Sequence, residues 1–408
     1  GELDLNESER EKLGKSIDSL ASSIGGRHIV GWTFHALAQA KKYDREFERW
    51  GLTRTSDNFQ GSAPEPQMPW GYLYQLGIKH IHAHGDANEE DFRKLLMLVR
   101  NGITIMNVQP YSGMEGMVLD AKTLMPFLIE SVVYDSLFTF SQLPARHAEQ
   151  LVDFLAKELV LNSSHDCLSL HSVASTAIEL LKAADALRPT IVRAKDVARR
   201  LRRSQKNVRT LLDSTFTCGA TTNERLRYPP SSTDFDFDDH PLLQVAEGAY
   251  LCPPAALCGK AVLEAFFAFA RRRDKNFDSR VGTLLEAFIR NVALTRGLKP
   301  KHGDYSFGKT QSDCDFVVET NDTVVFLEVK KKGLNRLSKS GKEASDISLL
   351  VDLAKSLIKS QQQALQHATM LRKHGHLSLS NKDGVSSEVD WKDQKVIRVS
   401  VSLFDCGS

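Results

Sequence analysis

The segments Ser312-Asp313-Cys314-Asp315-Phe316-Val317-Val318 and Val324-Val325-Phe326-Leu327-Glu328-Val329-Lys330 set the architecture expected for the C-terminal third of this chain. Both are rich in valine and other apolar residues, which predicts two adjacent β-strands. Side chains two apart in a strand share a face, so Phe326, Glu328 and Lys330 line one side of the second strand. Because an acid and an ammonium at the end of an apolar strand are costly unless paired or bound to something, these charges indicate a site.

Asp315, Glu328 and Lys330 together suit metal-assisted hydrolysis of a phosphodiester. Carboxylates hold Mg²⁺, and the metal activates water and neutralises phosphate charge. Lys330 would orient the attacking water or stabilise the developing charge. Asp313 shares a face with Asp315 and could support the metal from outside its ligand shell. The alternative is an exposed edge strand whose Glu and Lys are cross-strand partners or a protection against aggregation.

At these residues the chain resembles the PD-(D/E)xK nuclease superfamily, in which an acid ends one strand and E-x-K stands on the next. Asp315 and Glu328-Val329-Lys330 match that pattern, whereas the proline is absent and Ser312 precedes the acids. The resemblance implies a glutamate on an upstream helix, a position that Glu286 fills. RecB-like members also carry a downstream glutamine helix, which points to Gln363, with His367 replacing that helix's tyrosine.

The resemblance implies a C-terminal α/β restriction-endonuclease-like fold, with a mixed central sheet flanked by helices. It further implies Mg²⁺, for which Mn²⁺ substitutes, bound by Asp315, Glu328 and Glu286, with Lys330 and Gln363 completing the catalytic set. The expected activity is Mg²⁺-dependent cleavage of nucleic acid, DNA before RNA, in microbial antiviral defence or DNA processing. We expect a homodimer or a larger complex. The alternative is a nucleic-acid-binding or scaffold protein that keeps a degenerate, non-cutting nuclease fold.

A basic segment upstream resembles a helix-turn-helix. Eight Lys or Arg and one acid lie between Arg193 and Arg209. Val197, Ala198 and Leu201 would pack the first helix, and Ser204 would cap the second. Cations that neutralise phosphates add affinity that falls with salt. The alternative is a winged-helix fold used for packing, with a solvated basic face. The expected nucleic-acid contacts are Arg199, Arg200, Arg202, Arg203, Gln205, Lys206, Asn207 and Arg209.

Length and composition bound the remaining possibilities. A chain of 408 residues, 41% hydrophobic and 25% charged with a net charge of +2, predicts several globular domains. Six cysteines without a C-x-x-C pair favour a reducing, cytoplasmic setting. No apolar run is long enough for a membrane helix, so no membrane partner is expected. Because the chain begins with glycine and stops soon after a predicted final strand, we expect it to be a piece of a longer protein.

Four regions follow from the apolar periodicity and the turn-forming residues. The chain as a whole is expected to be multidomain. Residues 1–161 form a mainly helical N-terminal domain without a motif that indicates its role. Residues 164–228 form the helix-turn-helix-like basic module. Residues 229–275 hold a linker, a hairpin and a connecting helix, and residues 276–408 form the nuclease-like domain.

Overall fold

The computed structural model describes residues 7–52, 68–86, 88–105, 138–159, 169–219, 221–228, 240–308, 310–330, 351–352, 354–381 and 384–403. These residues divide into two compact units, an N-terminal unit that ends at Asp274 and a C-terminal unit that begins at Lys275. The linker predicted at residues 229–239 lies outside the described residues. No described helix is both long enough and apolar enough to span a membrane.

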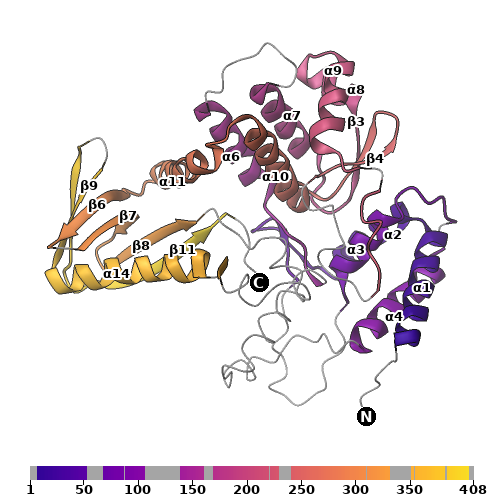
Figure 1. Cartoon of the computed structure of the whole chain (residues 1–408), viewed down its shortest axis with the longest axis horizontal. Helices are drawn as coiled ribbons and strands as arrows, with labels where there is room; N and C mark the ends of the chain where they lie inside the picture. Colours follow the sequence, from indigo (N-terminus) through magenta and orange to yellow (C-terminus); the bar gives the residue numbers. More distant parts are fainter. Residues whose placement is uncertain are drawn as a thin grey trace. The chain divides into compact units, whose positions relative to one another are not determined.

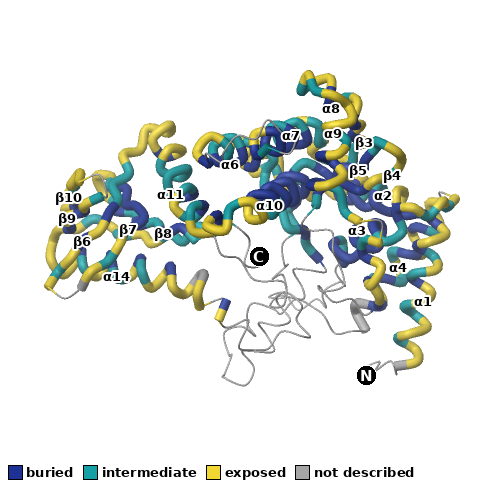
Figure 2. Tube along the Cα trace, turned by 45° about the horizontal axis from the view of Figure 1, so that its top comes forward, coloured by how far each residue is buried: buried dark blue, intermediate teal, exposed yellow. Residues whose placement is uncertain are grey.

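The N-terminal unit is mainly helical in its described part, as the periodicity predicts (Figure 1). Its centre is α10, which is buried along most of its length because alanine and phenylalanine occupy nearly all of its faces (Figure 2). The helices are α1 (Glu7–Ile24), α2 (Gly26–Gln39), α3 (Trp70–Lys79), α4 (Glu89–Ile105), α6 (Ala145–Glu158), α7 (Leu170–Ala183) and α10 (Ala255–Arg273). The short strands β1 (Tyr43–Asp44) and β2 (Arg49–Trp50) pair with each other.

The basic module adopts a winged-helix arrangement. After β3 (Thr190–Arg193) come the predicted helix pair, α8 (Ala194–Leu201) and α9 (Gln205–Leu211), and a π-helical turn, Leu212–Phe216. The hairpin β4 (Leu243–Ala246) and β5 (Ala249–Cys252), which we expected to act as a connector, instead joins β3 in a sheet of order β3-β5-β4. The turn and the cap form as predicted: Ser204 Oγ accepts a hydrogen bond from the Asn207 backbone N–H at 3.3 Å.

The winged-helix module shares its hydrophobic cores with the helices that precede it in the sequence. Leu226 and Tyr228 pack in one core with buried residues of α1, α3 and α4. Phe34 of α2 lies in a second core that also holds Leu243 and Leu251 of the hairpin. The sequence boundary near residues 161–164 therefore does not separate two compact bodies. Composition did not reveal this, because the contacts join segments far apart in the chain.

The C-terminal unit is built on a mixed sheet, as expected, that has six strands in the described residues. The order is β10-β9-β6-β7-β8-β11, antiparallel throughout except for β11, which runs parallel to β8. The two predicted apolar strands are β7 (Thr310–Glu319) and β8 (Thr323–Lys330). The other strands are β6 (Lys301–Phe307), β9 (His376–Ser380), β10 (Ser386–Asp390) and β11 (Lys395–Ser402).

Two helices flank this sheet, and both were predicted. α14 (Lys359–His374), preceded by a π-helical turn at Ala354–Ile358, packs against β8 and β11. Ala364 and Ala368 of α14 meet Val324 and Phe326 of β8 in the core. α11 (Phe277–Thr295) contacts β8 and is drawn on the other side of the sheet from α14 (Figure 1). α14 thus buries one face of the sheet, while Val325 and Leu327 on the other face of β8 are half-buried.

A break in strand register lies in the middle of β7, at Asp315 and Phe316. Lys301 of β6 pairs with Val317, but Gly303 pairs with Cys314, so Asp315 and Phe316 both stand opposite the single residue His302. Such a β-bulge bends the strand and re-aims its side chains. It lets Cys314 and Val317 both enter the core beneath α14, although they are three residues apart.

Substitution of Gly303 by alanine tests the close approach of β6 to β9. A Cβ there would lie 2.5 Å from the Ser380 carbonyl oxygen at φ +136°, whereas Gly308, at φ +58°, has no described atom within 4 Å of such a Cβ. Alanine at either position should cost about 1–2 kcal/mol of backbone strain. Gly303→Ala should cost about 1–3 kcal/mol more through overpacking. Urea unfolding measures both variants, and equal losses would contradict the close packing.

Candidate active site

Glu328 and Lys330 lie at the end of β8 and face α14, as the strand periodicity predicts. Glu328 is fully buried and Lys330 is partly exposed. The Lys330 Nζ lies 3.3 Å from Glu328 Oε2 and 3.8 Å from Asp315 Oδ2. The ammonium therefore stands between two carboxylates from neighbouring strands.

Asp315 is placed by the bulge in β7. Regular pairing between β7 and β8 is present from Glu319 to Phe316, and the Asp315 carboxylate then takes over, accepting the Val329 backbone N–H at 2.6 Å. The side chain thus replaces a main-chain partner in the ladder. This hydrogen bond fixes Asp315 beside Lys330, where the regular pairing of the two strands ends.

Glu286 joins this group from α11. Burial and then the charge of Asp315 raise the pKa of Glu286 to about 7, while Arg290 and Lys330 oppose the rise. Burial and then the charge of Glu328 raise the pKa of Asp315 to about 6, opposed by the Val329 N–H and Lys330. Four carboxylates interact here with two cations. The carboxylates are Glu286, Asp313, Asp315 and Glu328, and the cations are Lys330 and Arg290.

Two further residues contact the site from beneath, and the sequence reasoning did not assign them a role in it. His367 of α14 is fully buried and its Nε2 lies 2.8 Å from Glu328 Oε1. Its Nδ1 lies 2.8 Å from the Tyr305 hydroxyl on β6. The sequence held two signals for His367: it is a polar residue among the core-facing positions Ala364, Ala368 and Leu371, and the resemblance places it where the glutamine helix carries a tyrosine. Nothing local marked Tyr305, since aromatic residues are common in strands.

Gln363 stands one helical turn before His367, on the same face of α14. Its side-chain oxygen is buried and has no hydrogen-bond partner among the described residues. Gln361, the competing glutamine, is exposed and donates from its amide to Ser400 Oγ at 2.8 Å. Between the two, Gln363 is the residue with an unused buried acceptor next to the site.

Cys314, Glu328 and His367 offer ligand atoms within 4.8 Å of one another, a spacing that raises the question of a soft-metal centre. Both ring nitrogens of His367 are already engaged, one directly with Glu328. Burial, followed by the charge of Glu328, raises the pKa of the Cys314 thiol well above its usual value. Without a metal the thiol therefore stays protonated, and within this buried trio His367 and Glu328 are hydrogen-bonded to each other.

In the basic module, the predicted contacts differ in whether their charges are already paired. Arg199 pairs with Asp196 and Arg200 with Glu179. Arg209 pairs with Asp213 and with Glu247 at the turn of the β4–β5 hairpin. No side-chain hydrogen bond or ion pair within the described residues involves Arg202, Arg203 or Lys206. The side chains of Gln205 and Asn207 are exposed at the start of α9.

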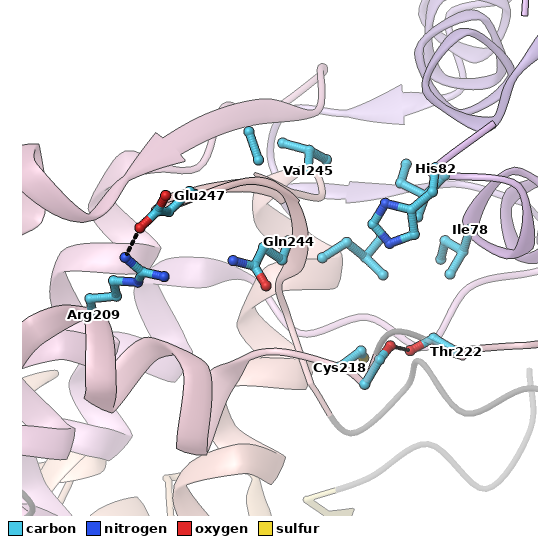
Figure 3. Close-up of a pocket in the computed structure, with 12 residues that line it drawn as sticks. Ile78, His82, Arg209, Cys218, Thr222, Gln244, Val245 and Glu247 are labelled. Carbon is cyan, nitrogen blue, oxygen red and sulfur yellow. Dashed lines mark hydrogen bonds and ion pairs between the residues drawn. The ribbon is translucent and has the colours of Figure 1, made fainter. Parts of the chain in front are cut away.

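A cavity of about 500 Å³ lies beside the hairpin in the N-terminal unit (Figure 3). Ile78, Ile81 and His82 line it opposite residues of β4, and the Arg209–Glu247 ion pair forms part of its wall. Arg209, which the sequence places among the nucleic-acid contacts, is therefore paired with an acid at the surface.

Comparison with protein-family models, with curated proteins and with solved structures found no match to this chain.

Glu286→Gln tests the electrostatic strain of the site. The folded protein raises the pKa of Glu286 from 4.5 to about 7, so this group favours folding most below pH 4.5. The free energy of unfolding that it contributes is lost as the pH rises through about 7. Glutamine should therefore raise stability by about 1 kcal/mol at pH 8 in EDTA, allowing for partial exposure, and by less at pH 5. Thermal unfolding measures this. The exposed Glu388→Gln is the matched control, and an equal response of both variants would contradict the strain.

Proposed function

We propose that the C-terminal unit is a Mg²⁺-dependent nuclease of the restriction-endonuclease-like class, acting on DNA, and that the winged-helix module binds the nucleic acid. The observation that carries the proposal is the position of Lys330. A lysine beside two carboxylates at the end of a buried strand, with a third carboxylate supplied by a helix, is a costly arrangement that a packing role does not require.

The donor set fits Mg²⁺. Asp315, Glu328 and Glu286 supply oxygen ligands, which a hard cation prefers, and their site has two more carboxylates than cations. Those three residues would hold Mg²⁺, with Mn²⁺ substituting. The ion, when bound, supplies an activated water and neutralises charge on the phosphate.

The protein's own groups would position the reactants. Lys330 is partly exposed, so its ammonium can turn from Glu328 towards a phosphate oxygen or the attacking water. The Val329 N–H holds Asp315 in place, and His367 holds Glu328. Gln363 keeps a buried amide oxygen that can accept a hydrogen bond from a positioned water.

The winged-helix module supports DNA as the substrate. Arg202, Arg203 and Lys206 cluster at the turn between α8 and α9, and their unpaired charges suit phosphates. Arg209 is set aside by its pairing with Glu247. Cutting both strands with one site per chain calls for two copies, so we propose a homodimer or a larger complex. By resemblance, we also propose a cytoplasmic role in microbial defence or DNA processing.

Cleavage of circular and linear DNA, with RNA in parallel, tests the activity. With Mg²⁺ the chain should cut DNA, and EDTA should abolish cutting. Lys330→Ala and Asp315→Ala should each lower the rate by at least about 100-fold, because each removes charge from the reacting centre. The exposed Lys373→Ala should leave the rate unchanged. Undiminished cutting by either site variant would sink the proposal, and DNA binding without cutting would support the non-cutting scaffold.

Salt dependence of DNA binding tests the winged-helix module separately. Arg202→Ala and Lys206→Ala should each weaken binding similarly for unrelated sequences and lower the slope of log K against log salt by about 1. Lys15→Ala, the loss of an exposed charge on α1, should do neither. Fluorescence anisotropy with labelled duplexes gives both quantities. Equal slopes for all three variants would place the DNA-binding surface elsewhere.

A further inference from the structure

We propose that Tyr305 and His367 are positioning residues that fix the carboxylate of Glu328 for its cation, with the His367 ring held as the tautomer that carries its proton on Nε2. The identity of the cation rests on the proposed function. The hydrogen-bond relay from Tyr305 through His367 to Glu328 does not.

The contact with Glu328 determines the hydrogen-bonding role of the His367 Nε2 atom. An ionised carboxylate accepts hydrogen bonds and donates none, so at 2.8 Å the His367 Nε2 must be the donor. Neither side chain is exposed, so water cannot replace this bond if the ring turns away. A lost partner would leave a buried acceptor unsatisfied, which is expensive.

Tyr305 determines the hydrogen-bonding role of the His367 Nδ1 atom. Its hydroxyl lies 2.8 Å from Nδ1 and is buried. In a neutral ring that carries its proton on Nε2, Nδ1 is an acceptor, so the Tyr305 hydroxyl is the donor to Nδ1. The relay then runs in one direction, from Tyr305 through His367 to Glu328.

The relay engages one oxygen of the Glu328 carboxylate and leaves the other available to a cation. Oε1 accepts from His367, while Oε2 faces Lys330, which also approaches Asp315. The His367 ring is kept from turning by Tyr305, whose ring meets it edge-on at 5.5 Å between centroids, and by Phe326 at 5.6 Å. Strand β6, strand β8 and helix α14 thus set the orientation of one carboxylate.

Substitution by two different amides separates positioning from packing. The amide nitrogen of Gln can reach the place of Nε2, whereas that of Asn reaches only the place of Nδ1. We expect His367→Gln to bind Mn²⁺ within about threefold of wild type, and His367→Asn to bind it about 10–100-fold more weakly, as losses of such supporting contacts do. Titration calorimetry on the full chain, without DNA, measures both. Equal affinities for the two variants would overturn the proposal, provided that thermal unfolding in EDTA shows both folded.

Nitrogen NMR of ¹⁵N-histidine-labelled chain reads the tautomer directly and needs no metal or substrate. His367→Gln assigns the signals by their disappearance. In the proposed tautomer the two ring nitrogens resonate far apart, with the proton on Nε2, and Tyr305→Phe, which removes the donor to Nδ1, shifts the Nδ1 signal. A proton on Nδ1, or a Tyr305→Phe spectrum identical to wild type, would overturn the relay. Wild type that shows the relay but binds no Mn²⁺ would overturn the proposed function instead.

Discussion

The C-terminal unit depends on giving each oxygen of the fully buried Glu328 carboxylate a partner. An isolated buried carboxylate is costly, and the unit meets that cost with two partners, the His367 ring on one oxygen and the Lys330 ammonium on the other. Each partner sets a condition on the fold. The bond from His367 forms only if α14 packs on β8 in one register, and the contact with Lys330 forms only if β8 extends to residue 330. Both conditions are met through the apolar contacts of Ala364, Ala368 and Phe326.

Asp315 follows a different principle from Glu328. Its hydrogen bond to the Val329 N–H satisfies a backbone group that regular pairing with β7 would have satisfied, so ending the β7–β8 ladder at Phe316 costs little. The same bond favours ionisation, while burial and Glu328 oppose it. The raised pKa of Asp315 and Glu286 records a balance between these effects. Gathering these carboxylates in a partly buried place lowers the stability of the folded unit, as is common at functional sites.

Much of the C-terminal fold could be predicted because its signals are local. The alternation in β8 placed Glu328 and Lys330 on one face, and the family resemblance implied the helices that carry Glu286 and Gln363. The bulge at Asp315 and Phe316 could not be predicted, since it is defined by the partner strand and no glycine marks it. Tyr305 was missed for a similar reason: its role exists only through His367, which lies on a distant segment. In the N-terminal unit, Leu226 and Tyr228 gave no sign of the helices they pack against.

The parallel pairing of β11 with β8 has a consequence for the timing of assembly. Ser400 stands opposite Glu328 in register and bonds to Ser360 of α14, while the Leu403 N–H bonds to the Lys330 carbonyl. A parallel neighbour must return from far along the chain, and such non-local closures form late. During synthesis, β7, β8 and α11 leave the ribosome well before β11 does. A nascent chain would therefore carry its charged residues without the strand that braces them until β11 has been made.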